Sequence, residues 1–443
     1  MTFNSITFIF WFLPVFFILY YISPRQIKPW TLLAFSYLFY AWGSVVDLVV
    51  LLAVTLLNWG FGHYISGRKY VFAAAIIADV SILAAFKYFE MPIASPLGIS
   101  FFIFHAISYL SDVYHSRSDA AKNPAELALY LALFTKLTMG PIVSYSSLAP
   151  QLKNLNVSLE KIEAGIVRFC VGLAKKAVLA GSLAEICENC WADAGNSTLS
   201  AWIGILGFTL QLYFDFSGYS DMAIGLSNML GIDIAENFRY PYLSYSVSDF
   251  WRRWHISLGA WFREYMYIPL GGSRVKLPRL MLNLLIVWAA TGIWHGTGFN
   301  FIVWGLLHGF FVCIEKILVR WIHFPKLRLF GWIYTLAVVI IGWVLFNSAD
   351  LPSAIEYIRA MFGNAVNLDN SLAMLMLHDN KVIIAAAIIF ATPIPAQIGR
   401  RLFDGLPPAV VSAARLLLIA FCLYISITYM MVSGYTPFIY TEF

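Results

Sequence analysis

Long apolar stretches recur along almost the whole chain, and no other feature of the sequence constrains the fold as strongly. A helix of about 20 apolar residues crosses the hydrocarbon core of a bilayer, and thirteen candidate stretches can be placed in the 443 residues. Thirteen is an upper figure, because several are short or interrupted, as by Gly140-Pro141 within the sixth and by Pro92–Gly98 before the fifth. We therefore expect an all-α integral membrane protein with some short, broken or re-entrant helices. The stretches are about 6–22, 30–45, 46–65, 70–88, 98–114, 125–146, 161–182, 200–215, 280–295, 300–322, 330–347, 380–395 and 409–433.

The charge content agrees with this expectation and excludes two other classes of chain. Charged residues make up 12% of the sequence, against roughly 25% in soluble domains. The net charge of +5 is spread along the chain without a long run of like charge, so neither a disordered chain nor a nucleic-acid-binding arm fits. The first stretch, Ile6–Ile22, has no basic residue before it and no small-residue cleavage site after it, which favours a retained span over a signal peptide. Without an internal repeat or a long soluble insertion, the sequence predicts one polytopic domain over 1–443.

The basic residues of the early loops predict the orientation of the chain in the membrane. Lys and Arg are enriched in cytoplasmic loops. If the N-terminus lies outside, six basic residues fall in inward loops and only Lys87 in an outward one. The sequence therefore predicts an outside N-terminus. The six inward residues are Arg25, Lys28, Arg68, Lys69, Arg117 and Lys122.

The five cysteines do not form a disulfide framework. Cys187 and Cys190 are the only close pair, and a C-x-x-C without a second pair is a weak metal signal. We expect them to be ordinary apolar residues near a helix end, and we predict no metal site. The others are Cys170, Cys313 and Cys422.

The apolar pattern fails between Asp249 and Arg279, where charges and aromatic residues alternate. Basic residues among Trp and Tyr suit the membrane–water interface. At helical spacing Asp249 and Arg253 are i,i+4 partners, and Trp251 shares a face with His255. From composition alone the plain interpretation is an interfacial amphipathic helix. The eight charges are Asp249, Arg252, Arg253, Arg263, Glu264, Arg274, Lys276 and Arg279.

Two carboxylates upstream, Asp215 and Asp221, stand in an otherwise apolar region beside Ser217, Tyr219 and Ser220. An ionisable group at membrane depth indicates a function by default. The structural alternative is a pair of helices held by buried hydrogen bonds, with one Asp paired to an Arg of the charged stretch. Both interpretations stay open from the residues alone.

A histidine follows on a predicted helix. Trp288, Thr291, Gly292 and His295 share a face at i, i+3, i+4 and i+7, and the small Thr291 and Gly292 are expected to leave room beside the imidazole for a thin substrate. Gly296 and Gly298 are expected to end the helix. Histidine is the side chain best suited to proton transfer near pH 7, but composition alone does not single it out from others in similar surroundings. These are His63, His105 and His308.

Four segments stand out by their order and spacing: Phe214–Gly225, Phe250–Leu258, Tyr267–Gly272, and Ile293–Gly296 followed by Trp304–Gly309. Together they resemble the membrane-bound O-acyltransferase (MBOAT) family, and within it the bacterial branch that O-acetylates polysaccharides such as alginate. The match is strong over 208–310 and weaker at Pro96–Phe102, Gly140–Ile142 and Tyr435–Tyr440.

The resemblance implies a ring of helices around a central funnel or tunnel, where a cytosolic acyl donor meets an acceptor from the other face. It implies that His295 is the catalytic histidine and His255 the second histidine, which positions the donor or stabilises the developing oxyanion. Two departures affect donor recognition: His105 stands where relatives commonly have Gln, and Ser273–Arg279 lacks the usual Asn-Arg-Lys pattern. The residues predicted to bind substrate or donor are Arg253, Trp254, Asp215, Tyr219, Asp221, Trp294 and Thr291.

The reaction expected from both lines of argument is direct acyl transfer. His295 takes the proton of an acceptor hydroxyl, which attacks a thioester carbonyl, and the imidazolium then protonates the leaving thiolate. No Ser-His-Asp arrangement is evident, which favours direct transfer over an acyl-Ser intermediate. An acyl relay on His295 stays open as the alternative to direct transfer.

The polysaccharide branch implies a particular setting for this reaction. It implies acetyl-CoA or another acyl thioester as co-substrate with no bound cofactor, a polysaccharide acceptor, a periplasmic or extracellular acetyltransferase partner, and a bacterial inner membrane. Lipids are the other expected partners, and nucleic acid is not one. Three alternatives remain: teichoic-acid D-alanylation, a lipid- or protein-directed O-acyltransferase of the same family, and a non-catalytic acyl or glycan transporter. No inverted repeat speaks for a transporter.

Overall fold

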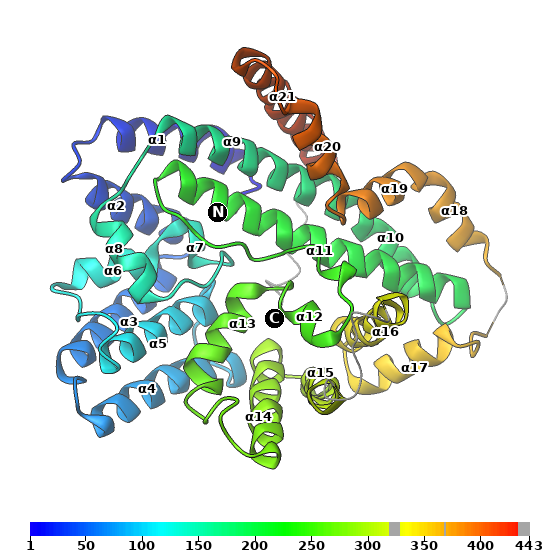
Figure 1. The fold of residues 1–443 in the computed structure, drawn as a ribbon, viewed down its shortest axis with the longest axis horizontal. Coiled ribbons are helices and arrows are strands. Elements are labelled where there is room, and N and C mark those ends of the chain that lie inside the picture. The colour runs from blue at the N-terminus through cyan, green and yellow to red at the C-terminus, as the bar shows by residue number, and fades with distance from the viewer. Residues whose placement is uncertain (319–327, 367–368, 433–443) are drawn as a thin grey trace. The chain divides into compact units, whose positions relative to one another are not determined.

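The computed structural model describes residues 1–318, 328–366 and 369–432 (Figure 1). Every regular element in these ranges is a helix, so the prediction of an all-α protein is confirmed for the described chain. The helices group into two compact units. Unit 1 comprises Met1–Gly172 and Tyr219–Glu236, and unit 2 comprises Leu173–Gly218 and Asn237–Phe443.

Among the described residues, seven helices are long and apolar enough to cross a bilayer. They are Val45–Tyr64 (α3), Lys69–Tyr88 (α4), Thr198–Met229 (α11), Leu277–His295 (α14), Phe299–Leu318 (α15), Arg328–Asn347 (α16) and Pro408–Val432 (α21). Ser371–Asp379 (α18) and Lys381–Phe390 (α19) form an eighth candidate that is bent by 67°. The chain is a multi-pass membrane protein, and thirteen spans was an upper figure, as stated.

Unit 1 contains the remaining N-terminal helices. The predicted break at Gly140-Pro141 is confirmed, because the sixth apolar stretch forms two short helices and then a non-helical segment. A Cβ on Gly140 would lie 2.5 Å from the Thr135 carbonyl oxygen, so the chain folds tightly back on itself there. The remaining helices are Phe8–Phe12 (η1), Leu13–Ile22 (α1), Lys28–Ala41 (α2), Ile99–Tyr114 (α5), Pro124–Ala132 (α6), Phe134–Leu137 (α7), Tyr145–Lys153 (α8) and Leu159–Ala174 (α9).

The loops predicted to face the cytoplasm meet at one end of unit 1. Near the end of α3, Trp59 Nε1 donates to the carbonyl oxygen of Ala121 at 3.2 Å. In the first loop, Arg25 bonds Asn154, next to Lys153, whose Nζ lies 3.7 Å from Glu126. Loops 23–27, 65–68 and 115–123 therefore lie together, as an antiparallel arrangement of the first helices requires.

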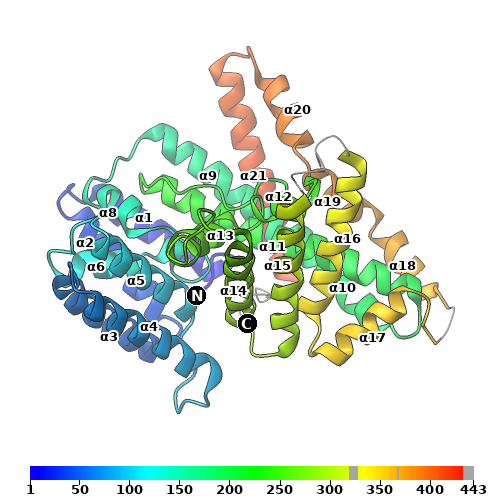
Figure 2. The same cartoon turned by 60° about the horizontal axis from the view of Figure 1, so that its bottom comes forward.

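In unit 2, α14, α15 and α16 stand side by side (Figure 2). The closest pair is α14 and α15, because glycines let their backbones meet. A Cβ on Gly292 would lie 2.4 Å from the Phe301 carbonyl oxygen, and one on Gly305 would lie 2.4 Å from that of Trp288. This contact fixes the end of α14 against α15.

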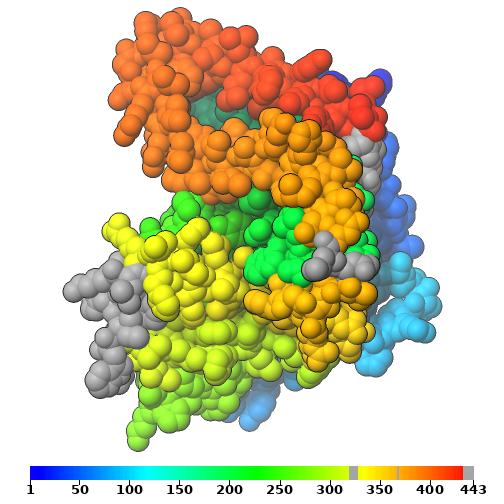
Figure 3. All heavy atoms as spheres, turned by 90° about the vertical axis from the view of Figure 1, so that its right-hand side faces the viewer, coloured from blue at the N-terminus to red at the C-terminus, as the bar shows by residue number. Residues whose placement is uncertain are grey.

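The other helices of unit 2 include the polar segments and the C-terminal helices. Figure 3 looks onto the last of them, in orange to red, which leave many large apolar side chains exposed, as expected of a surface that meets lipid. The helices of unit 2 not yet named are Lys175–Ala180 (η2), Gly181–Ala192 (α10), Pro241–Leu243 (η3), Val247–Trp251 (α12), Ile256–Phe262 (α13), Arg263–Tyr267 (η4), Leu351–Met361 (α17) and Ile394–Phe403 (α20). The N-terminal part of α11 also belongs to this unit.

Candidate active site

His295 is the last residue of α14. The helix stops there because Gly296 is extended, with φ −163° and ψ 170°, as the glycines of the sequence predict. The imidazole is buried at 3% exposure. Its ring centroid lies 4.6 Å from that of Trp294, 4.8 Å from that of Trp304 and 5.3 Å from that of Phe346. His295 therefore lies at a helix end with aromatic rings packed around it.

One expectation about its neighbours is wrong. Gly292 does not leave room beside the imidazole for a substrate, because α15 fills the space that a side chain would occupy. Thr291 is buried, and its hydroxyl donates to the carbonyl oxygen of Val287 one turn earlier, at 2.8 Å. A small residue in a sequence indicates a close approach without saying whether a ligand or another helix makes it.

The charged stretch is not one amphipathic helix. It is divided into α12 and α13 by His255, whose backbone is left-handed at φ 43° and ψ 54°. Trp251 and His255 therefore do not share a helical face, and that expectation is wrong. The Asp249–Arg253 pair is confirmed, with an oxygen–nitrogen distance of 3.0 Å. No glycine marks the break, so helical spacing alone could not reveal it.

The segment 237–239 holds His255 in place. The Ile256 N–H donates to the Asn237 carbonyl oxygen at 3.0 Å, and the Arg239 N–H donates to that of Arg253 at 2.9 Å. The side-chain oxygen Oδ1 of Asn237 accepts from the backbone N–H and the hydroxyl of Ser257 and lies 3.3 Å from His255 Nδ1. Sequence reasoning missed Asn237, because no periodicity relates it to a partner 18 residues away.

His255 itself is buried at 3% exposure. Burial lowers the pKa of its imidazole to about 3, so the ring is neutral near pH 7. It meets the ring of Phe216 edge-on at 4.6 Å.

An aromatic cluster connects the surroundings of the two histidines. From His255 the ring contacts run through Phe216 and Phe238 to Trp254, with centroid distances of 5.1 Å for each of the last two pairs. Trp254 then meets Trp343 at 5.0 Å, and Trp343 meets Phe346 at 5.8 Å, the ring beside His295. Unit 2 thus brings both histidines and Trp254 into one buried cluster.

Several polar atoms of this cluster have no hydrogen-bond partner among the described residues. They are Nε1 of Trp251, Trp304 and Trp343 and both ring nitrogens of His308. Centroid distances of 4.9 Å for Trp251–His308 and 5.6 Å for Trp251–Trp304 place them together. Buried polar groups are normally satisfied, so these donors beside His295 suit a polar ligand.

Asp215, which is buried, and Asp221, which is partly buried, are paired with basic residues that precede them in the chain. Asp215 bonds Lys176, and both side chains are at most 5% exposed. Lys176 lies in the π-helical turn η2, a distortion frequent at functional sites. In unit 1, Arg168 contacts Asp221 at 2.8 Å and also bonds Glu236. Both carboxylates are thus ion-paired, but the partner foreseen in the structural alternative, an Arg of the charged stretch, is wrong, because the partners come from α9 and η2.

The other predicted residues divide between the units. Arg253, Trp294 and Thr291 lie in unit 2 with the histidines. Tyr219 lies in unit 1, where its hydroxyl bonds that of Thr138.

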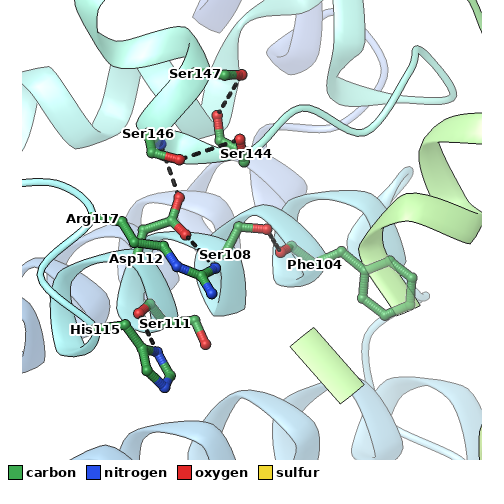
Figure 4. A network of polar contacts seen from close by, with 9 residues as sticks. All are labelled: Phe104, Ser108, Ser111, Asp112, His115, Arg117, Ser144, Ser146 and Ser147. Carbon is green, nitrogen blue, oxygen red and sulfur yellow. Dashed lines mark hydrogen bonds and ion pairs between the residues drawn. The ribbon is translucent and has the colours of Figure 1, made fainter. Parts of the chain in front are cut away.

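The end of α5 in unit 1 is held by a polar network (Figure 4). Asp112 accepts from the backbone N–H of Ser146 at 2.9 Å and lies 3.7 Å from Arg117. The neighbouring Tyr145 lines a cavity of about 230 Å³ together with Trp30, Asn123, Glu126 and Lys153. On α5, His105 Nε2 accepts from the Val143 N–H at 3.3 Å. This cavity lies at the end of unit 1 that carries the basic loops.

The close cysteine pair behaves as buried apolar residues. Cys187 and Cys190 both lie on α10, unbridged. Burial raises their pKa values to about 12 and about 11, so both thiols stay protonated at neutral pH. No group of three or more His, Cys, Asp or Glu in the described ranges is arranged to hold a metal.

Residues 3–349 match the membrane-bound O-acyltransferase family, and this range includes both histidine sites. The chain belongs to the MBOAT family. The resemblance of the four segments is thereby confirmed, and this MBOAT protein is an O-acyltransferase.

Curated relatives agree with the family assignment. The "Probable alginate O-acetylase AlgI" of Azotobacter vinelandii is 39% identical over 82% of this chain and 78% of its own. The "Peptidoglycan O-acetyltransferase" of Helicobacter pylori is 34% identical over 88% of this chain and 86% of its own. The "Teichoic acid D-alanyltransferase" of Bacillus subtilis is 26% identical over 57% of this chain and 69% of its own. The MBOAT chain thus shares most of its length with two O-acetylating relatives.

Proposed function

We propose that this O-acyltransferase uses acetyl-CoA to supply acetyl groups for the O-acetylation of an exported polysaccharide in a bacterial inner membrane. The observation that carries the proposal is the site of His295, a buried imidazole at a helix end beside unsatisfied indole donors. The relatives named for O-acetylation of alginate and peptidoglycan support acetyl as the group and a polysaccharide as the final acceptor. A periplasmic or extracellular partner protein carries the acetyl group to the polymer.

The chemistry follows from the side chains of unit 2. His295 accepts the proton of the acceptor hydroxyl as its oxygen attacks the thioester carbonyl carbon. The C–S bond breaks, and the imidazolium gives its proton to the leaving thiolate. General acid–base catalysis of this kind contributes about 10²- to 10⁴-fold. The Nε1 group of Trp304, whose ring lies 4.8 Å from that of His295, is available to stabilise negative charge on the carbonyl oxygen.

The other predicted contacts of unit 2 complete the proposed donor and substrate site. Arg253 and Trp254 shape its entrance, and Thr291 and Trp294 flank His295. Asp215, Tyr219 and Asp221 remain proposed contacts, in addition to the bonds they make within their own units.

Replacing His295 tests this proposal. We expect His295→Ala and His295→Gln to reduce the O-acetyl content of exported polymer by about 100-fold or more, at unchanged protein level. The matched control is His378→Ala, which removes an exposed histidine at the end of α18 and is expected to keep full activity. Normal acetylation by His295→Ala would refute the catalytic assignment.

A teichoic-acid D-alanyltransferase is the second candidate, because a relative with that name matches 57% of the chain. The two candidates differ in their donor. Purified protein with its partner should cleave acetyl-CoA and leave a D-alanyl thioester of a carrier protein intact. The reverse preference would favour D-alanylation, and accumulation of acylated lipid or protein would favour the remaining acyltransferase alternatives. If the protein binds acetyl-CoA and never cleaves it with its partner present, it is a transporter.

A further inference from the structure

The surroundings of His255 define which of its ring nitrogens carries the proton. Oδ1 of Asn237 accepts from the Ser257 backbone N–H at 3.1 Å. A backbone N–H can only donate, so this contact fixes which end of the Asn237 amide is oxygen. The same oxygen lies 3.3 Å from His255 Nδ1. Because Oδ1 can only accept, Nδ1 must be the nitrogen that carries the hydrogen.

The other ring nitrogen is therefore a lone-pair acceptor. Nε2 of His255 is buried and has no hydrogen-bond partner among the described residues. A neutral imidazole with its hydrogen on Nδ1 has no hydrogen on Nε2. An unsatisfied acceptor in a buried aromatic setting suits a ligand that donates a hydrogen bond.

We infer that His255 Nε2 binds an N–H or O–H group of one of the two substrates, and that Asn237 is the positioning residue that sets this tautomer. This inference rests on the proposed function. It assigns His255 to holding a substrate and removes the alternative in which its Nε2 donates to the oxyanion. The donors in the cluster beside His295 are indole N–H groups, which are free for that second task.

The backbone supports the same conclusion. His255 is held at φ 43°, a left-handed conformation that is uncommon for a residue with a side chain. The Ile256 N–H bond to the Asn237 carbonyl oxygen and the Arg239 N–H bond to the Arg253 carbonyl oxygen secure it on both sides. Such strain persists where surrounding structure over-determines it, often at binding sites. The ring is thereby presented in one orientation with one tautomer.

Variants of Asn237 test the positioning role, using O-acetyl content of exported polymer as the readout, which is independent of donor identity. We expect Asn237→Ala to lower acetylation by about 10- to 100-fold, the scale on which an orienting partner acts on a functional histidine. Asn237→Asp keeps an acceptor oxygen for Nδ1 and for Ser257, and we expect it to stay within a few-fold of wild type. Equal loss in both variants, or none in Asn237→Ala, would contradict the role of Asn237.

A methylated histidine distinguishes the tautomer from mere packing. Nδ1-methylhistidine at position 255 can carry only a lone pair on Nε2, and Asn237→Ala makes room for the methyl group. In the Asn237→Ala background we expect this methylated residue to raise the activity about tenfold above that of Asn237→Ala alone. Nε2-methylhistidine in the wild-type background has the same size but no Nε2 lone pair, and it should be as inactive as His255→Ala. If the Nδ1-methylated protein is instead less active than Asn237→Ala alone, Nε2 acts as a donor and the inference fails.

Kinetics with purified protein and its partner identify the bonded substrate. If the group that bonds His255 Nε2 is an amide N–H in the thiol arm of acetyl-CoA, His255→Ala raises KM for acetyl-CoA. Transfer from an acetyl thioester of a simple alkanethiol, which lacks that amide, is then unchanged. If it is the acceptor hydroxyl, KM for acetyl-CoA is unchanged and transfer falls. An unchanged rate with every substrate would overturn the assignment. The His295 variants test the proposed function separately, because they do not alter the Asn237–His255 contact.

Discussion

At the scale of single residues, Asp215 is an acid in an apolar helix, which suggests either a ligand site or a structural pair. Asp215 bonds Lys176, and both side chains are nearly fully buried. This pair gives Asp215 a structural role, whatever else it contacts. Removing one partner of a buried ion pair leaves an uncompensated charge.

Lys176 and Asp215 can be removed singly or together. We expect Asp215→Ala to destabilise the protein by about 3–5 kcal/mol, because Lys176 would remain buried without a carboxylate. The apolar double variant Lys176→Met/Asp215→Leu should recover most of that loss. The thermal unfolding midpoint in detergent measures both, with the exposed Asp404→Ala as the control that stays unchanged.

The double variant also tests whether Asp215 contacts a substrate. A stable but inactive double variant would support the proposed contact, and a stable, active one would leave Asp215 a purely structural role. A double variant as unstable as Asp215→Ala would contradict the pairing argument.

The two histidines show how far single residues can be predicted. The position of His295 at a helix end follows from Gly296 and Gly298, whose backbones commonly end helices. The conformation of His255 does not follow from its neighbours, because its left-handed backbone is imposed by Asn237 and Arg239 from another part of the chain. Local signals were sufficient in the first case, and a contact distant in sequence decided the second.

At the scale of helices, glycine spacing determines which pairs pack closely. Gly292 and Gly305 bring α14 against α15, and α14 carries His295 while α15 carries Trp304. The sequence indicated that this face of α14 was special, but it suggested a substrate where α15 is found. The break at Gly140-Pro141 was predictable because proline and glycine interrupt helices locally. The break at His255 was not.

Gly292→Ala tests the importance of this packing. The new Cβ would lie 2.4 Å from the Phe301 carbonyl oxygen, so the helices must separate. We expect a loss of about 1–3 kcal/mol in stability and lower acetylation, because His295 shifts relative to Trp304. The control is Gly60→Ala on α3, where an added Cβ meets nothing within 4 Å, and which should be neutral or slightly stabilising. An unchanged unfolding midpoint for Gly292→Ala would mean that α15 yields freely at this point.

At the scale of the whole molecule, the loops of unit 1 reduce the predicted orientation to one question, which is the side of the membrane that the basic loops face. α3 connects the two ends of this unit: near its start Asp47 Oδ2 accepts from the Leu97 N–H at 3.0 Å, and near its end Trp59 bonds Ala121. The loop 89–98 therefore lies at the end opposite to loops 65–68 and 115–123. All six basic residues counted from the sequence must then face one side of the membrane, and Lys87 lies near the other.

Cysteine labelling in intact cells tests this topology. The five native cysteines are all buried, so they give little background with a membrane-impermeant thiol reagent. Exposed positions are Ser66 and Asp119 at the basic end and Ser95 at the other. Because basic loops favour the cytoplasm, we expect Ser95→Cys to react in intact cells, and Ser66→Cys and Asp119→Cys to react only after permeabilisation. The opposite labelling would place the N-terminus inside. The basic end of unit 1, with the cavity beside Tyr145, would then lie on the outer face. Labelling of Ser66→Cys and Ser95→Cys from the same side would mean that α4, which joins these two loops, does not cross the membrane.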